Sequence, residues 1–342
     1  MFDALVDMKP SLFVKTLKEK KLLLPPLSGY TDYPYRVILA GFHPPFIITE
    51  MANARAIVQG NRRTSQIIQI VSGKQYNGVQ LVGSIPEYMG KAAEIVEGLG
   101  FDYIDINMGC TARKVSCRGE GIALMKHENV ACDIVSTVAS TVEIPVTCKL
   151  RLGASKHTLN VVSLSQKLVD AGAVALTIHG RSGEKKFGMT VDRTIIEETV
   201  KSLSVPVVAN GGIYTGADAR HMLQETHAAA VMPGRGLIGN PWIVPEILSA
   251  VSDKKFFSPT LKQKKDVCLK HLDLLVEFYG ERRAVLKMRS ILPHYFSSCL
   301  FLKDLKKVVQ QQMASVADIP LLLDRIHDDR ENIVYESGVV LH

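Results

Sequence analysis

Residues 145–181 read PVTCKLRLGASKHTLNVVSLSQKLVDAGAVALTIHGR. This stretch begins and ends with short apolar runs, at residues 145–150 and 174–179. Between the runs, Leu164 and Leu168 lie one helical turn apart, and Gly172 follows where a helix commonly ends. Because both runs are apolar on both faces, they are typical of parallel strands covered by helices. The stretch therefore predicts a strand–helix–strand unit.

The same unit recurs along the chain. The predicted strands cover residues 22–27, 46–49, 79–82, 103–106, 145–150, 174–179, 206–209 and 229–232. Capping boxes are predicted from Ser84 to Glu87 and from Thr215 to Asp218. Eight buried strands with helices between them predict an α/β fold, an eight-stranded parallel (β/α)8 TIM barrel. A doubly wound sheet is disfavoured because no GxGxxG motif follows the first strand.

The strand pattern stops near residue 250. A helix is predicted from Thr260 to Gly280, with further helices at residues 283–300 and 303–313 and a kink or break at Pro293. We therefore expect a barrel domain at residues 1–252 and an all-helical domain at 253–342. The excess of Lys and Arg over Asp and Glu is concentrated at residues 253–313, which is typical of a solvated helical surface or of a module that binds polyanions.

Composition excludes several classes of protein. With 342 residues and 46% hydrophobic residues, the chain is neither disordered nor too short for a large core. It has no apolar run long enough to span a membrane and no pattern of an export signal. The six cysteines form no CxxC pair, so neither a disulfide framework nor a metal site is expected. A cytoplasmic protein with reduced thiols and no membrane contact is expected.

Polar residues and glycines follow the predicted strands at their C-terminal ends, where barrels of this kind carry their chemistry. These residues are Ser28, Gln80, Asn107, Lys149, Arg151, His179, Arg181, Asn210, Gly211, Gly212, Gly234 and Arg235. Glycines after the seventh and eighth strands let backbone N–H groups converge on a phosphate, and Arg235 can add a bidentate contact. A phosphate site is predicted there, although such glycines also occur in ordinary turns.

A phosphate site alone fits a sugar phosphate as well as a flavin. Gln80, Lys149 and His179 place an amide, a cation and an imidazole at three separate strand ends. A flavin needs hydrogen bonds along one polar edge of its ring and positive charge where the reduced ring becomes anionic. Each of the three side chains, taken singly, could also be an ordinary buried polar group.

Several blocks of the sequence resemble one enzyme family. They are LLPPLSGYTDYPYR (23–36), QLVGSIP (80–86), DINMGC (105–110) with RKV (113–115), CKLR (148–151), LTIHGR (176–181), VVANGG (207–212), VMPGRG (231–236) and GNP (239–241). In this order, over about residues 22–245, they resemble the motifs of the tRNA-dihydrouridine synthases. The block ending in Cys110 is highly specific, whereas the glycine blocks are shared with other flavin barrels.

The resemblance implies a barrel that binds FMN and reduces the C5–C6 double bond of a uracil base in tRNA, with NADPH or NADH as reductant. By position it implies flavin contacts from Pro26, Leu27, Ser28, Gln80, Lys149, His179, Asn210, Gly211, Gly212, Gly234 and Arg235, and substrate contacts from Asn107, Arg151 and Arg181. The chain departs from the family pattern at Leu27, where Met is common, at Thr111, where proline is usual, and at Gly212, where an acidic residue is common.

The resemblance also gives Cys110 as the catalytic proton donor, and the chemistry agrees. Hydride addition at C6 of uracil leaves negative charge that a proton at C5 relieves. A thiol is protonated at neutral pH yet acidic enough to release its proton. Cys117 on the same loop is the second candidate. Cys132 is predicted on a helix face and Cys148 inside the fifth strand, and both fit small buried apolar residues.

In this interpretation the protein is a monomer whose helical domain binds tRNA. Candidate phosphate contacts are Lys262, Lys264, Lys265, Arg282, Arg283, Lys287 and Arg289. Two alternatives stay open: an FMN barrel that acts on a free pyrimidine, of the dihydroorotate or dihydropyrimidine dehydrogenase type, and a catalytically silent RNA-binding protein. The first offers no reason for a basic helical domain, and the second none for the intact cysteine, lysine and glycine blocks.

Overall fold

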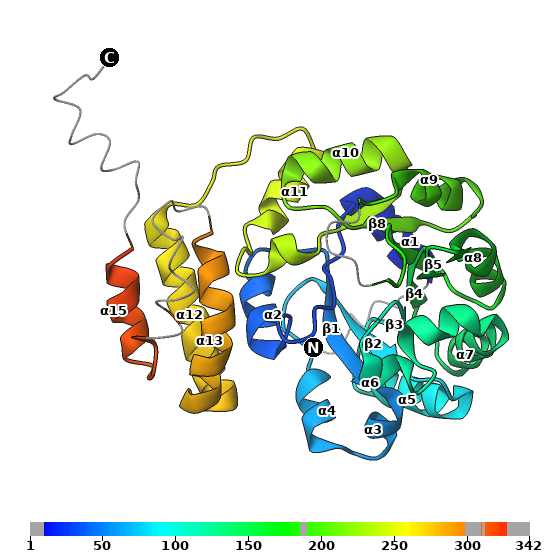
Figure 1. Ribbon diagram of the computed structural model, residues 1–342, viewed down its shortest axis with the longest axis horizontal. Coiled ribbons are helices and arrows are strands. Elements are labelled where there is room, and N and C mark those ends of the chain that lie inside the picture. The colour runs from blue at the N-terminus through cyan, green and yellow to red at the C-terminus, as the bar shows by residue number, and fades with distance from the viewer. Residues whose placement is uncertain (1–9, 185–189, 298–308, 310–311, 327–342) are drawn as a thin grey trace, which may run out of the picture. The chain divides into compact units, whose positions relative to one another are not determined.

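A curled parallel sheet forms the centre of the larger part of the molecule (Figure 1). The computed structural model describes residues 10–184, 190–297, 309 and 312–326. Within these residues one sheet has seven strands in the order β1-β2-β3-β4-β7-β8-β9, and every neighbouring pair is parallel. Its strands are β1 (Phe46–Asn53), β2 (Tyr76–Val82), β3 (Tyr103–Met108), β4 (Val146–Arg151), β7 (Ala175–His179), β8 (Val207–Asn210) and β9 (Ala230–Met232). A separate small hairpin pairs β5 (Gly153–Ser155) with β6 (Thr158–Leu159).

The first predicted strand, 22–27, takes the eighth position of the barrel without forming a regular strand. Leu22 makes a parallel bridge to Val231 of β9. On the other side, the Leu24 N–H donates to the carbonyl of Phe46 in β1 at 3.2 Å. The ladder cannot continue because the next two residues, Pro25 and Pro26, have no backbone N–H. The predicted TIM-barrel class is confirmed, with one strand shortened to a bridge.

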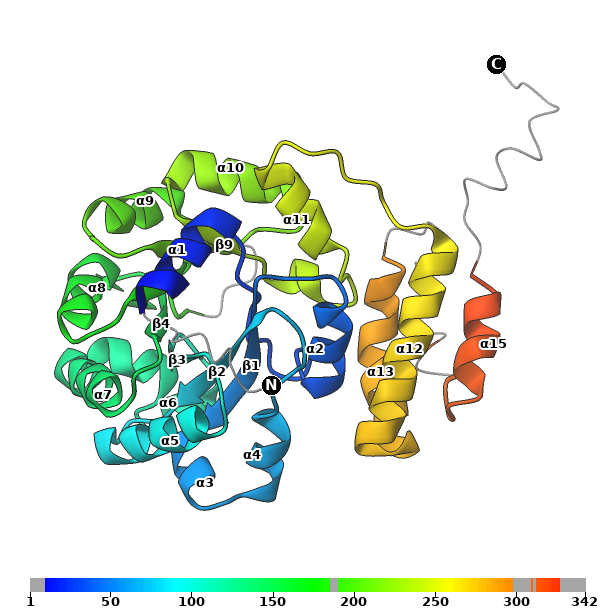
Figure 2. The same ribbon diagram turned by 180° about the vertical axis from the view of Figure 1, so that it is seen from behind.

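Helices alternate with the strands and surround the sheet (Figures 1 and 2). Those of this unit are α1 (Pro10–Lys20), α2 (Tyr33–Ala40), α3 (Ala54–Val58), α4 (Arg62–Ile67), α5 (Pro86–Gly98), α6 (Arg113–Ser116), α7 (Glu128–Thr141), α8 (Val161–Asp170), α9 (Arg193–Lys201), α10 (Gly216–Thr226) and α11 (Ile243–Val251), with 3₁₀ turns at Gly121–Lys126 and Arg235–Leu237.

The two predicted capping boxes have different outcomes. At α10, Thr215 and Asp218 make both reciprocal bonds, which confirms the prediction. At α5 the prediction is wrong: Ile85 is the N-cap residue and no side chain caps the helix. The Ser84 hydroxyl donates instead to the carbonyl of Arg118 at 2.9 Å. Pro86 begins α5 and lacks an N–H, so this helix has one unsatisfied donor fewer.

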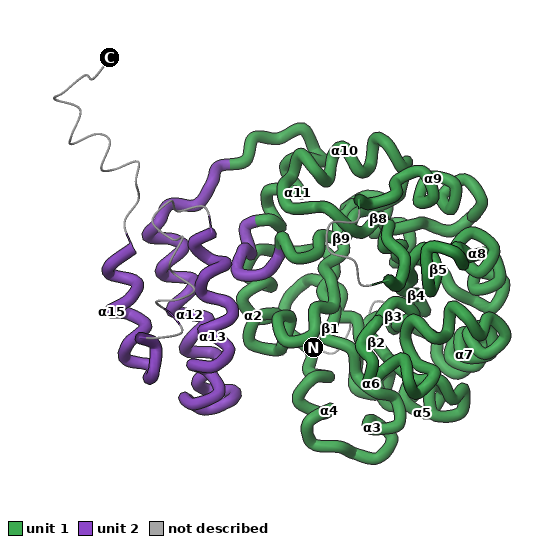
Figure 3. Tube along the Cα trace, in the orientation of Figure 1, with its two compact units in different colours: residues 1–236, 243–256 green, residues 237–242, 257–342 purple. Residues whose placement is uncertain are grey.

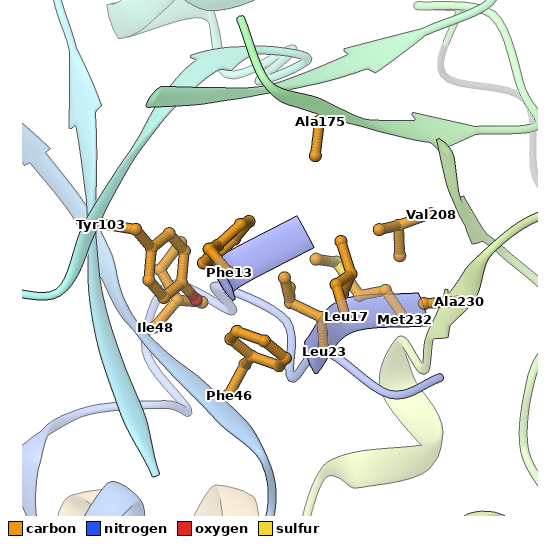
Figure 4. Packing of buried hydrophobic residues seen from close by; sticks show 10 residues of the cluster. All are labelled: Phe13, Leu17, Leu23, Phe46, Ile48, Tyr103, Ala175, Val208, Ala230 and Met232. Atoms are coloured by element: carbon orange, nitrogen blue, oxygen red, sulfur yellow. The ribbon is translucent and has the colours of Figure 1, made fainter. Parts of the chain in front are cut away.

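Helix α1, which the sequence analysis did not identify, fills the end of the barrel where the strands begin. Phe13 and Leu17 are fully buried there, among the first inward-facing residues of the strands (Figure 4). The ring of Phe13 lies 5.1 Å from the rings of both Phe46 and Tyr103, measured between centroids. Burying each such side chain contributes about 1.5–3 kcal/mol. The N-terminal end of the barrel is therefore an apolar core.

The remaining residues form a second, helical unit. The chain divides into residues 1–236 with 243–256 and residues 237–242 with 257–342 (Figure 3). The helical unit contains α12 (Leu261–Tyr279), α13 (Glu281–Tyr295) and α15 (Asp318–Asp324).

The start of α12 is as predicted, because Thr260 and Gln263 form a capping box. The break predicted at Pro293 does not occur at that residue. Helix α13 continues through Pro293, which cannot donate the backbone bond of its own position, and ends two residues later. The helix predicted at 303–313 lies outside the described residues except for 309, 312 and 313.

Candidate functional site

A cavity of about 850 Å³ opens at the C-terminal ends of the strands. It is lined by Cys110 and by every residue predicted to contact the flavin or the base: Pro26, Leu27, Ser28, Gln80, Asn107, Lys149, Arg151, His179, Arg181, Asn210, Gly211, Gly212, Gly234 and Arg235. Other residues that line the cavity, among them Met51, Glu184 and Tyr214, were not predicted from the sequence. The fold thus brings together side chains that are up to 209 positions apart, from Pro26 to Arg235.

The loop that carries Cys110 is held through its backbone. The side-chain oxygen of Asn107 accepts the N–H groups of Cys110 at 2.9 Å and of Gly109 at 3.2 Å. The carbonyl of Cys110 accepts the N–H of Ile122 at 3.0 Å. Arg151 Nε donates to the carbonyl of Gly109 at 2.9 Å. These bonds hold the loop although Thr111 stands where the family has proline.

Cys110 differs from the other cysteines of the described residues, because it alone among them lines the cavity. Its side chain is partly exposed. Cys117 is exposed but does not line the cavity, so the geometry favours Cys110 over this second candidate. Cys148 is buried in β4, and burial raises the pKa of its thiol well above the usual value.

Lys149 supplies a fixed cation to the cavity. Its Nζ donates to Oδ1 of Asn210 at 3.0 Å, and the Asn210 amide nitrogen donates to the carbonyl of Met232 at 2.8 Å. Burial lowers the pKa of Lys149 to about 8, with a further lowering from the charge of Arg151. The ammonium group is therefore still mostly protonated at neutral pH, and its orientation is set by Asn210.

His179 is a neutral imidazole in this site. Burial, and then the charges of neighbouring cations led by Lys149, lower its pKa to about 2. A guanidinium nitrogen of Arg181 lies 3.4 Å from His179 Nε2. Because a guanidinium can only donate, Nε2 accepts and the single ring proton is on Nδ1. His179 can therefore donate a hydrogen bond from Nδ1 without carrying charge.

The glycines and the arginine that were predicted to bind phosphate follow β8 and β9. Gly211 and Gly212 have φ values of +119° and +70°, and a Cβ on Gly211 would lie 3.0 Å from the ring of His179. Both the conformation and the close approach require glycine at position 211. Arg235 Nη2 donates to the hydroxyl of Tyr214 at 2.9 Å, which holds the guanidinium at the edge of the cavity. Above Gly234 the space is open, since a Cβ there would touch nothing within 4 Å.

At the first strand position, the loop after Pro26 is held by hydrogen bonds between its own residues. The N–H of Leu27 donates to Thr31 Oγ1 at 2.8 Å, and the Leu27 carbonyl accepts the N–H groups of Tyr30 and Thr31. The backbone of Leu27 is thus fixed whichever side chain it carries, so the replacement of methionine does not alter the loop's hydrogen bonds.

Taken together, these donors fit a phosphate-bearing aromatic cofactor. The cavity offers a fixed cation, a neutral imidazole donor and an amide, together with glycines and an arginine. Among residues 10–184, 190–297, 309 and 312–326, no group of His, Cys, Asp and Glu could hold a metal ion. Nor does any helix in that part of the chain have the length and apolar character needed to cross a membrane.

Comparisons with known proteins agree with this chemistry. A family model described as dihydrouridine synthase matches residues 23–326. The tRNA-dihydrouridine synthase B of Pasteurella multocida is 34% identical over 263 residues, covering 77% of this chain and 79% of that protein. The probable tRNA-dihydrouridine synthase 1 of a Synechocystis species is also 34% identical, over 80% of this chain and 79% of its own.

Among solved structures, that of histamine dehydrogenase from Rhizobium sp. 4-9 matches with a TM-score of 0.48 at 14% identity, covering 74% of this chain and 49% of that one. The assignment to a family rests on the sequence matches, which extend over more than two thirds of this chain and of its relatives. They confirm the resemblance seen in the motifs and imply a flavin as the cofactor that the cavity fits. This chain is a member of the dihydrouridine synthase family and an enzyme of the oxidoreductase class.

Proposed function

We propose that this protein reduces the C5–C6 double bond of uridines in tRNA, with FMN as its bound flavin and NADPH as the reductant. The observation that carries the proposal is the partly exposed thiol of Cys110, which faces the same cavity as the predicted flavin-binding residues. The family supports the reaction, and its relatives' names supply the substrate.

The chemistry divides between the cofactor and Cys110. When bound, the reduced flavin supplies a hydride for C6 of the uracil base. Cys110 donates the thiol proton to C5, where the electron pair of the former double bond becomes available, and the thiolate regains a proton from solvent. The side-chain oxygen of Asn107, which accepts the N–H of Cys110, and Arg151, which donates to the carbonyl of Gly109, keep the backbone of the cysteine loop in place during this transfer.

The chain's own residues would hold the flavin at two ends. Lys149 would stabilise the negative charge of the reduced ring, while Gln80, His179 and the loop of Pro26, Leu27 and Ser28 would contact the ring. The ribityl and phosphate groups would lie against Asn210, Gly211, Gly212, Gly234 and Arg235.

The proposed substrate contacts differ in how many donors they have left. Arg151 uses Nε and Nη1 on the carbonyls of Gly109 and Ser182, so Nη2 is the nitrogen best placed to serve a base or phosphate. Asn107 uses its side-chain oxygen on the cysteine loop and donates its amide to Gln80 at 2.8 Å. Arg151 and Asn107 thus combine a structural role with any contact to the base.

Residues 253–342 would form the RNA-binding domain, beside a catalytic domain at residues 1–252. Of the predicted phosphate contacts, Lys262, Arg282 and Arg283 are exposed. Two others have structural contacts: Arg289 donates to the carbonyl of Met313, and Lys287 lies over the ring of Tyr279. Electrostatic attraction to tRNA therefore depends mainly on the exposed cations. We further propose that the target base is extruded into the cavity, and that the protein acts as a cytoplasmic monomer.

The test compares substrates. The purified protein, loaded with FMN and supplied with NADPH or NADH, is incubated with an unmodified tRNA transcript, an rRNA fragment, free uracil or orotate. Dihydrouridine is detected as the gain of two hydrogens by mass spectrometry of the digested RNA. We expect turnover on tRNA and little on the free pyrimidines. Turnover confined to a free pyrimidine would favour the dehydrogenase alternative, and a protein without visible flavin absorbance after purification and loading would refute the proposal.

A further inference from the structure

A buried carboxylate in the middle of the barrel has no role in the function proposed above. Asp105 lies on β3 and is 3% exposed. Its Oδ2 accepts Nε2 of Gln80 at 2.7 Å, and its Oδ1 accepts the hydroxyl of Thr147 at 2.7 Å. Gln80 then accepts the amide of Asn107 at 2.8 Å, and Asn107 accepts the N–H groups of the cysteine loop. One chain of hydrogen bonds therefore links the barrel interior to Cys110.

The direction of every bond in this chain is fixed from its outer end. The backbone N–H groups of Gly109 and Cys110 can only donate, so the oxygen of Asn107 must face them. Its NH₂ group must then face Gln80, whose oxygen accepts and whose NH₂ points inward. The group at position 105 must therefore accept, which a carboxylate does with both oxygens.

Removing this acceptor would leave the inner NH₂ of Gln80 without its partner in a buried place. Turning the amide over would not restore a partner, because its oxygen would find no donor and its NH₂ group would meet the NH₂ group of Asn107. The Gln80 side chain would therefore leave this position, and the NH₂ group of Asn107 would lose its acceptor. Because a buried polar group without a partner is costly, the change would be passed along the chain to the cysteine loop.

We infer that Asp105 is a positioning residue: its carboxylate holds Gln80 where Gln80 accepts the amide of Asn107, and thereby holds the loop that presents Cys110 to the cavity. This inference rests on the proposed role of Cys110. The pKa of Asp105 is raised on balance, because burial outweighs the lowering by the bonds from Gln80 and Thr147 and by the charge of Lys149.

The test uses variants of Asp105 and Thr147 that differ in whether an acceptor remains for Nε2 of Gln80. Asp105→Leu removes the acceptor at similar size. Asp105→Asn keeps an oxygen for Gln80, because its NH₂ group can donate to Thr147, whose hydroxyl already lies 3.3 Å from the carbonyl of Ile104. Thr147→Val removes one of the two donors to Asp105 and serves if Asp105→Leu does not fold. Thr177→Val makes the same change at another buried threonine and is the matched control.

The first measurement is amide hydrogen exchange, which does not depend on activity. With FMN bound, we expect exchange at Gly109 and Cys110 to be about tenfold faster in Asp105→Leu and to rise in Thr147→Val, with no change in α7. Asp105→Asn and Thr177→Val should exchange like the wild type. Unchanged exchange at residues 109–110 in both Asp105→Leu and Thr147→Val, or an equal rise throughout the barrel, would overturn the inference.

The second measurement separates the two half-reactions of the same variants. We expect uridine reduction by the prereduced enzyme to fall about tenfold or more in Asp105→Leu and to recover in Asp105→Asn, whereas flavin reduction by NADPH, which needs no cysteine, falls by a smaller factor. Equal losses in both half-reactions would show a role in packing alone and would overturn the inference. If the wild type reduces no uridine, the proposed function fails, and the exchange data alone decide on Asp105.

Discussion

The two ends of the barrel differ in chemistry although the same strands build both. On β3, Tyr103 faces inward at the start of the strand and packs on Phe13, whereas Asn107 faces inward at its end and holds the cysteine loop. Tyr103 and Asn107 are four positions apart on one strand, so only about 13 Å separates an aromatic core from a polar site. The difference shows how the barrel separates stability from chemistry: its closed end is apolar and its open end is a network of donors, acceptors and cations.

Replacing the thiol at the open end should have the largest effect. We expect Cys110→Ala to keep its flavin but to reduce uridine about 10²–10⁴-fold more slowly, since it loses its general acid. The measurement is single-turnover reduction of tRNA by the prereduced protein. Cys132→Ala, on α7, is the control and should react like the wild type. A fully active Cys110→Ala protein would transfer the role to another donor.

The closed end should respond in stability and not in chemistry. Phe13→Ala removes a fully buried ring from the apolar cluster, and we expect the free energy of unfolding to fall by about 3–5 kcal/mol. Urea unfolding measures this loss, and activity per folded molecule should stay near that of the wild type. Phe257→Ala, at a side chain that is 74% exposed, should cost little. A stable Phe13→Ala protein with altered catalysis would break the separation between the two ends.

Cofactor affinity should depend on the open end alone. We expect Arg235→Ala to weaken FMN binding by about 1.5–3 kcal/mol, because a hydrogen bond to a charged group is worth about that much. Fluorescence titration of the flavin measures the dissociation constant. Arg220→Ala removes an arginine that pairs with Asp253 on the surface and should not change it. Undiminished binding by Arg235→Ala would mean that the phosphate is held elsewhere.

The smallest expected effect is on the free energy of unfolding at acid pH. Because the folded protein holds His179 at a pKa of about 2 and the ordinary pKa of histidine is 6.5, only the unfolded chain takes up this proton as the pH falls below 6.5. Stability should therefore be lost with falling pH, by about 1 kcal/mol between pH 7 and 5.5 from this residue. His179→Asn should lose that part of the acid sensitivity, while His271, with its pKa lowered to about 3, keeps its own part. Identical pH profiles of stability for the two proteins would contradict the neutral state of His179.

Much of the fold could be predicted because buried parallel strands leave a local signature. Seven of the eight predicted strands are regular strands near the predicted positions, since continuous apolar runs flanked by turn residues are a property of neighbouring residues. The remaining predicted strand, 22–27, is only a bridge because Pro25 and Pro26 end its ladder. Helix α1 was missed because its single apolar face becomes meaningful only when the barrel end beneath it exists.

The predicted strand ends and the family motifs were enough to name fifteen of the residues that line the cavity, and the motif around Cys110 indicated the chemistry, although Met51, Glu184 and Tyr214 were not predicted. How these residues act on one another could be seen only in the folded molecule. The hydrogen bonds of Asp105 with Gln80 and Thr147, and the burial and neighbouring cations that keep His179 neutral, join residues from different strands. Such contacts depend on distances in three dimensions and on exclusion of water, and neither is encoded in the spacing of residues along the chain.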